Sequence, residues 1–99
     1  MNKFYIGDTP LIKVDCVTDI TNATVTKIRY IKPSGDTNLW NADSVEADPH
    51  TGEGRYLLYQ TSNSDIDEVG TWKFHAYVEF SDNKHHGEVA TQEIFALGS

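Results

Sequence analysis

Residues 72–80 form the longest stretch of the sequence in which side-chain character alternates. The apolar positions are Trp72, Phe74, Ala76, Val78 and Phe80, and the positions between them are Lys73, His75, Tyr77 and Glu79. Successive side chains of a β-strand point to opposite faces. This period of two therefore predicts a strand with one face in the core and the other in solvent.

Shorter runs rich in β-branched and aromatic residues precede and follow this stretch, and turn residues separate them. Strands that recur about every 8–12 residues are typical of an all-β sandwich. We therefore predict one domain over residues 1–99, an all-β sandwich of about seven antiparallel strands. The expected strands are residues 3–6, 11–17, 25–32, 39–40 with 44–47 as an extension, 55–60, 72–80 and 85–96.

Alternation also assigns core-facing residues outside the longest strand. Ile12, Val14 and Cys16 share the inward face of their strand. Residues 55–60 are partly apolar on both faces, so we expect this strand to be central in its sheet. Ile20 lies in a polar connection and is expected to fill a gap under the sandwich.

The turn that leads into the longest strand has a distinctive spacing. Glu68, Gly70, Trp72 and Phe74 follow one another at intervals of two. This resembles the corner that opens strand F of immunoglobulin-like sandwiches, where an acidic residue, a small residue and a Tyr precede the second Cys. Trp72 stands at the Tyr position, and its indole can only donate, so the usual hydroxyl bond must be replaced or lost.

The resemblance implies an immunoglobulin-like sandwich without a disulfide. Phe74 occupies the position of the second Cys, and Cys16 occupies that of the first, so the resemblance places the thiol against the ring. Cys16 is the one cysteine of the chain, so no internal disulfide can form. A small buried hydrophobe is the better interpretation of this residue, because a catalytic thiol needs an exposed, electropositive setting.

The net charge of the chain narrows the classes of partner that it could bind. The formal net charge of −7 disfavours binding to nucleic acid or to anionic membranes and favours solubility.

The N-terminus has no apolar run of signal-peptide length, and no segment reaches the length of a membrane helix. A fold held by packing alone suits synthesis in a reducing cytoplasm.

The chain has four histidines that could serve as metal ligands. His50, His75, His85 and His86 are too scattered for a zinc signature. Two ligands could converge if His75 lay beside His85 or His86 across the final hairpin. Exposed strand histidines are the preferred interpretation, so we predict no metal site and no cofactor.

Two groups of acidic side chains lack the spacing of an EF-hand loop: Asp65, Asp67 and Glu68, and Asp43, Glu46 and Asp48. We interpret them as solvated loop acids, with Asp65 or Asp67 capping nearby N–H groups and Ser64 capping one helical turn. No nucleophile–base motif, phosphate-binding loop or catalytic carboxylate pair is apparent, so we do not expect an enzyme.

Aromatic side chains are the best interface candidates. Trp40, Tyr59 and Tyr77 could expose aromatic surface, which is enriched in the cores of protein interfaces. Packing of these rings under loops or long side chains is an equal alternative. His85 and His86 complete the candidate interface residues.

The order of the turn motifs resembles a family of small immunoglobulin-like proteins of tailed bacteriophages and prophages. The similarity covers nearly the whole chain, and the ordered motifs carry it rather than any one of them. The motifs are Ile-Gly-Asp-Thr at 6–9, Lys-Pro-Ser-Gly at 32–35 before Trp40, the acidic corner at 65–72, Ala-Tyr-Val at 76–78 and Gly-Glu at 87–88.

The resemblance implies a non-enzymatic structural component of the virion, in the tail, baseplate, neck or capsid surface. Its partners would be other virion proteins, and its location would be the virion after synthesis in the host cytoplasm. The His85–His86 pair and the long break at 48–54 depart from a plain member of the family and could belong to a partner surface.

The sequence also allows two alternative functions. One is a carbohydrate- or host-surface-binding module in which Trp40, Tyr59 and Tyr77 form a stacking platform and acidic loops hold calcium. The other is a small phage-encoded inhibitor of a host protein. Free edge strands would also allow homo-oligomers to form.

Overall fold

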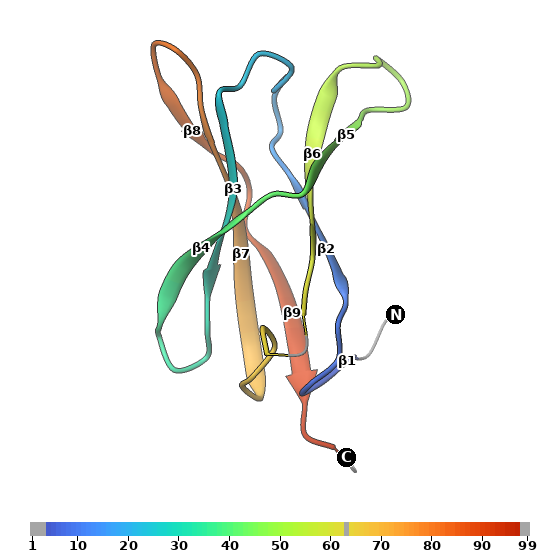
Figure 1. Ribbon diagram of the computed structural model, residues 1–99, viewed down its shortest axis with the longest axis vertical. Helices are drawn as coiled ribbons and strands as arrows, with labels where there is room; N and C mark the ends of the chain where they lie inside the picture. Colours follow the sequence, from blue (N-terminus) through green and yellow to red (C-terminus); the bar gives the residue numbers. More distant parts are fainter. Residues whose placement is uncertain (1–3, 63, 98–99) are drawn as a thin grey trace.

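The computed structural model describes residues 4–62 and 64–97, which form an all-β sandwich of two sheets. Figure 1 shows the two layers, with β3, β4, β7 and β8 on one side and β2, β5 and β6 on the other. The described residues contain no helix. The strands are β1 Phe4–Tyr5, β2 Leu11–Asp15, β3 Val25–Ile31, β4 Thr37–Asn41, β5 Ser44–Ala47, β6 Gly54–Gln60, β7 Gly70–Glu79, β8 Lys84–His86 and β9 Ala90–Phe95.

The large sheet has the order β1-β9-β7-β3-β4, with β8 also paired to β7, and the small sheet has the order β2-β6-β5. β6 is therefore the central strand of its sheet, as expected. The expectation of about seven antiparallel strands is wrong in detail. There are nine strands in the described residues, and β1 pairs with β9 in parallel.

One of the extra strands arises because the expected closing strand is interrupted. Opposite β7, His86 pairs with Tyr77, and Ala90 pairs with Phe74. The closing strand therefore advances by four residues while β7 advances by three. This one-residue excess is the signature of a β-bulge, which divides the strand into β8 and β9.

The other extra strand arises because residues 44–47 do not extend β4. β4 pairs with β3 in the large sheet, whereas β5 pairs with β6 in the small sheet. The chain crosses between the sheets at two residues: Ala42 N–H donates to the Thr26 carbonyl at 3.2 Å, and Asp43 N–H donates to the Leu58 carbonyl at 2.8 Å. Figure 1 shows this crossing segment in green.

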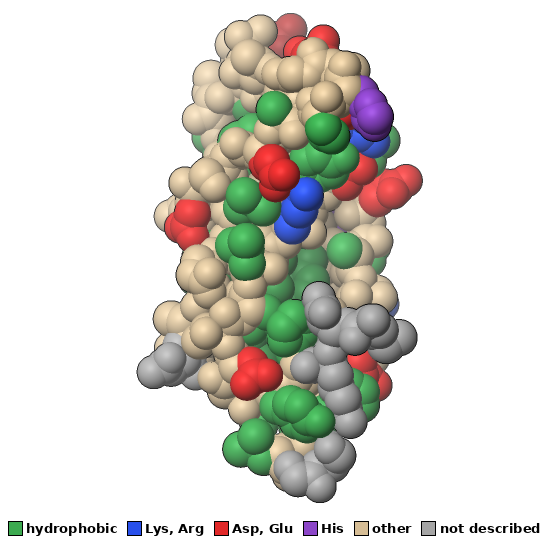
Figure 2. Space-filling view, turned by 90° about the vertical axis from the view of Figure 1, so that its right-hand side faces the viewer, with side chains coloured by type: hydrophobic (Ala, Val, Ile, Leu, Met, Phe, Trp, Pro, Cys, Tyr) green, Lys and Arg blue, Asp and Glu red, His purple; other side chains and the backbone are tan. Residues whose placement is uncertain are grey.

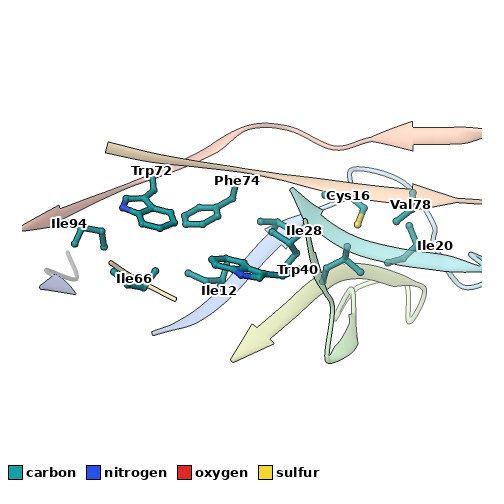
Figure 3. Packing of buried hydrophobic residues seen from close by; sticks show 13 residues of the cluster. Ile12, Cys16, Ile20, Ile28, Trp40, Ile66, Trp72, Phe74, Val78 and Ile94 are labelled. Carbon is teal, nitrogen blue, oxygen red and sulfur yellow. The ribbon is translucent and has the colours of Figure 1, made fainter. Parts of the chain in front are cut away.

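The core lies between the sheets and confirms most of the inward faces expected from alternation. Trp72, Phe74, Ala76 and Val78 of β7 are buried, and Phe80 beyond the strand is half-buried. Figure 3 shows Trp72, Phe74 and Val78 of β7 facing side chains of the other elements. The buried apolar residues are Ile12, Val14, Cys16, Ile20, Ile28, Trp40, Leu57, Ile66, Trp72, Phe74, Ala76, Val78 and Ile94.

The corner before β7 is held by three hydrogen bonds that involve the side chains of Trp72 and Glu68. The indole N–H of Trp72 donates to the Glu68 carbonyl at 2.9 Å, so the hydroxyl bond is replaced rather than lost. The Glu68 carboxylate accepts from the backbone N–H of Ser34 at 3.1 Å and from its hydroxyl at 3.0 Å. Gly70 has φ +129°, and a Cβ there would lie 2.8 Å from Pro33 Cβ. The corner is thus locked onto the turn between β3 and β4.

Cys16 is fully buried, as expected, but its place along β7 differs from the expectation. A Cβ added at Gly87 would lie 3.1 Å from Cys16 Cα and 3.0 Å from Ala76 Cβ, so Cys16 lies level with Ala76. In Figure 3 the Cys16 side chain lies near Val78, whereas the Phe74 ring lies near Trp72. The expected pairing of Cys16 with Phe74 is therefore displaced by one inward position.

The expected helical turn near Ser64 is a simple turn instead. Its stabilising group is Asp65, whose carboxylate accepts from the Ser62 backbone N–H at 2.7 Å and from the Ser62 hydroxyl at 3.1 Å. The expectation that Asp65 caps local N–H groups is confirmed. Ile20 is 2% exposed, which confirms its expected place under the sandwich.

Candidate interaction face

The candidate site is the outer face of the large sheet. Backbone pairing across β4, β3, β7, β8 and β9 aligns its outward side chains in three adjacent rows, which we call the outer face. The rows are Asn41, Lys27, Tyr77 and His86; Leu39, Arg29 and His75; and Thr37, Ile31, Lys73 and Thr91.

The outer face is positively charged in an otherwise acidic protein. Lys27, Arg29 and Lys73 lie in the three rows, and none of the row positions is Asp or Glu. The whole chain carries −7, so subtracting these three positive charges leaves −10 on all other residues. Figure 2 shows the side on which β2, β5 and β6 lie, where red carboxylates are scattered.

Cations elsewhere in the described part of the chain are paired with carboxylates. Lys13 contacts Glu46 at 3.3 Å, and Lys32 contacts Asp67 at 3.0 Å. Arg55 contacts Asp15 at 2.8 Å and Asp48 at 3.2 Å.

The cations of the outer face differ from these. Lys27, Arg29 and Lys73, together with Lys84 at the start of β8, form no ion pair with any other described residue. The nearby acids Glu79 and Glu93 lie beyond the rows. Their carboxylates accept hydrogen bonds from Tyr77 at 2.6 Å and from Thr71 at 2.8 Å. No described carboxylate therefore forms an ion pair with the cations of the three rows.

A hollow of about 400 Å³ opens on this face, lined by Arg29, Thr37, Asn38, Leu39, Tyr77 and His86. Because β3 lies between β4 and β7, Arg29 is at the middle of the hollow and Leu39 and Tyr77 are on opposite sides. The rings of Tyr77 and His86 contact each other with centroids 5.3 Å apart. The hydrogen bond to Glu79 raises the pKa of Tyr77, so this side chain stays a neutral, mostly apolar wall.

Trp40, a candidate for exposed aromatic surface, lies in the core instead. Its side chain points inward because it pairs with the inward residue Ile28, and it is 8% exposed. It is stacked between Tyr30, at 4.2 Å between ring centroids, and Tyr59, at 4.6 Å. The expectation that Trp40 exposes aromatic surface is therefore wrong.

Tyr59 belongs to the same stack and is only half-buried. Its hydroxyl donates to Asp65 at 2.9 Å. Burial, with the Asp65 bond as the second cause, raises the pKa of Tyr59 to about 12. The Tyr59 ring therefore supports the core rather than a platform shared with Tyr77.

The two adjacent histidines divide between the faces. His85 pairs with the inward residue Val78, and its Nε2 donates to the Cys16 carbonyl at 3.0 Å. His86 points outward and lines the hollow beside Tyr77. Of the candidate interface residues, Tyr77 and His86 are thus brought together on one surface. Arg29 and Leu39 were missed, because only the pairing between strands places them there.

The histidines do not converge as metal ligands. His75 pairs with Arg29, and His86 pairs with Tyr77, so the two histidines do not stand directly opposite each other across the hairpin. Within residues 4–62 and 64–97, no three His, Cys, Asp or Glu side chains form a group that could hold a metal ion. The same ranges include no helix suited to spanning a membrane.

A second polar hollow, of about 140 Å³, lies beside the Arg55 ion pairs at one end of the sandwich. Arg55 donates twice to the Asp15 carboxylate, at 2.8 and 3.1 Å, and lowers the pKa of Asp15. Asp15 also accepts from the Val17 N–H at 2.8 Å, which holds Val17 at φ +60°. Because these groups satisfy one another, we assign them a structural role.

Comparison of the chain with protein-family models, with curated proteins and with solved structures finds no match.

Proposed function

We propose that the sandwich is immunoglobulin-like. In that fold, strands B, E and D share one sheet, strands C, F and G share the other, and variable-type domains add C′ to the second sheet. Here β2, β6 and β5 would be B, E and D, and β3, β7 and β8–β9 would be C, F and G, with β4 in the place of C′. The bond from Trp72 to the carbonyl four residues upstream supports this assignment, because it has the role of the tyrosine-corner bond.

We further propose that the protein is a non-enzymatic structural component of a tailed-phage virion, and that it docks on other virion proteins through the outer face. The observation that carries the docking surface is the set of unpaired cations around a hollow on a chain of net charge −7. The order of the turn motifs, which resembles that of small immunoglobulin-like phage proteins, supports the virion setting. Many copies on a symmetric particle would let weak contacts act together.

Mass spectrometry of purified particles of the phage that encodes the chain tests this proposal. We expect the chain to co-purify with the particles at a constant copy number and to be lost when its gene is deleted. We also expect the deletion to change particle structure or stability in electron micrographs. Intact, stable and infectious particles without the gene, or particles that never contain the chain, would contradict a structural role.

The structure does not assemble the rings required for a carbohydrate-binding platform. Trp40 and Tyr59 stack on each other in the core, and Tyr77 is on the outer face of the large sheet. A glycan-binding role would need another surface. Inhibition of a host protein could use the same outer face, and capture of a host protein in place of a virion protein would favour that alternative.

A further inference from the structure

The chemistry of the outer face indicates the kind of partner, if the proposed docking role holds. We propose that the outer face binds an extended acidic segment of a partner protein along β3, with one carboxylate on Arg29 and the methylene groups of that acidic side chain between Leu39 and Tyr77. Lys27 and Lys73 would receive further carboxylates on either side.

Arg29 is the centre of this arrangement. Its side chain is exposed, lines the hollow and forms no ion pair with another described residue. A guanidinium binds a carboxylate through two parallel N–H···O bonds, which is stronger and more directional than a contact with a lysine. The residues beside it in its row, Leu39 and His75, offer no competing carboxylate.

The spacing of the cations matches an extended polypeptide. Lys27 is two residues before Arg29 on β3, and Lys73 is in the row on the other side of Arg29. Outward rows of a sheet are about 6.6–7 Å apart along the strands, which is also the repeat of alternate side chains in an extended chain. A segment with acidic residues at alternate positions could therefore meet all three cations in succession.

The walls of the hollow favour a peptide over other anions. Leu39 is 41% exposed, and the Tyr77 ring is opposite it, so the methylene groups of a Glu side chain that reaches Arg29 would be covered on both sides. A nucleic acid or an anionic membrane presents many charges to the whole protein, and the −10 on the remaining residues would repel it. A segment with three carboxylates, one for each row, ends before the rows that contain Glu79 and Glu93, so it meets the cations without crossing those acids.

Edge pairing is a weaker mode of docking here. β4 is the edge strand beside the hollow, and one of its backbone donors is already occupied, because Leu39 N–H donates to the Asn38 side chain at 2.9 Å. Such a cap reduces the capacity of an edge to accept another strand. The ligand is therefore expected to lie on the outer face, along β3, rather than to extend the edge of the sheet.

NMR titration of the ¹⁵N-labelled full chain tests the inference. The probe is a blocked five-residue peptide with Glu at the first, third and fifth positions, which matches the three rows. The controls are the same peptide with Lys in place of Glu, and an oligothymidylate of equal charge. We expect the acidic peptide to shift amide signals of β3, β4, β7 and β8. We expect Arg29→Glu to weaken binding at least tenfold.

A matched variant distinguishes binding at the outer face from a general effect of the protein's net charge. Lys13→Glu makes the same change of sign on the small sheet, so we expect it to change the affinity less than twofold. Equal loss in both variants, shifts confined to other strands, or no binding would overturn the inference. Equal binding of the oligothymidylate would overturn the choice of a polypeptide, and self-association abolished by Arg29→Glu would show that a second copy is the occupant.

The outcomes also distinguish this inference from the proposed function. If the chain is present in virions but the acidic peptide does not bind, the docking role stands and the acidic partner is wrong. If the peptide binds through Arg29 but the chain is absent from virions, the ligand chemistry stands and the virion role is wrong.

Discussion

Replacing Trp72 with alanine should cause one of the largest losses of stability that a single substitution can produce in this chain. Trp72 has no exposed surface, and its ring lies 6.3 Å from Phe74 and 6.5 Å from Trp40 between centroids. Its N–H also holds the Glu68 carbonyl. The substitution therefore opens a cavity in the aromatic core and removes the bond that closes the corner.

The magnitude follows from these two losses. Truncating a buried Trp to Ala costs about 3–5 kcal/mol in the free energy of unfolding. The hydrogen bond contributes about 0.5–1.5 kcal/mol of that loss. Trp72→Phe keeps a large ring but lacks the donor, so we expect an intermediate loss of about 1–3 kcal/mol.

Urea unfolding followed by far-ultraviolet circular dichroism measures these losses without relying on the remaining tryptophan. Lys73→Ala is the matched control, because Lys73 is next in the strand but faces outward, and its change should stay within about 0.5 kcal/mol. A loss below about 1 kcal/mol for Trp72→Ala would refute the central place of this corner.

Three further predictions follow from the described contacts. Gly70→Ala should destabilise the fold by about 1–3 kcal/mol, and by more than Gly35→Ala in urea unfolding. Both glycines have positive φ, but only at Gly70 would a Cβ meet Pro33, at 2.8 Å; equal losses would remove that contact as a cause. Burial raises the pKa of the Cys16 thiol to about 11, so Ellman's reagent should label it slowly at pH 8 in the native protein and rapidly in urea; rapid native labelling would contradict its burial. The pKa of Asp15 is below its ordinary 3.8 because of Arg55, so this stabilisation is present above about pH 4 and is lost as the pH falls further. Asp15→Asn should therefore flatten the acid limb of a stability–pH curve, and an unchanged limb would show that the ion pair contributes nothing.

Local alternation was sufficient to predict most of the strands and many core residues. Trp72, Phe74, Ala76 and Val78 are buried where the period of two places them, because burial of one face of a strand leaves that pattern in the sequence. The corner could also be predicted from the sequence, because Glu68, Gly70 and Trp72 lie close together in the chain. Its hydrogen bond required only a donor on Trp72 and a nearby carbonyl.

The candidate site was harder to predict from the sequence, because it depends on which residues of different strands stand opposite each other. Arg29 joins Leu39 and His75 in one row through pairing between strands. Alternation within a strand specifies which face each side chain occupies, but a register shift of two residues keeps that face and changes the neighbours across the sheet, so the separate strands do not specify the rows. Trp40 was misplaced for the same reason, since only its pairing with Ile28 determines that it points inward.

The bulge and the crossing between sheets were missed for a related reason. Both are one- or two-residue features that separate strands with similar composition. Gly87 carries the one local signal at the bulge, because a Cβ there would lie 2.5 Å from the Asp15 carbonyl oxygen. That contact joins elements far apart in the sequence, so the glycine alone could not identify it.

Carbodiimide cross-linking of purified virions, followed by mass spectrometry, tests the central claim most directly. The reagent joins amines to carboxylates in direct contact, so it reports the charge pairing that is proposed for the outer face. We predict cross-links from Lys27 or Lys73 to Asp or Glu of another virion protein, and their loss in particles that carry the Arg29→Glu chain. Virions that contain the chain but yield links only from other surfaces would contradict the outer face as the docking site, and virions without the chain would contradict the structural role.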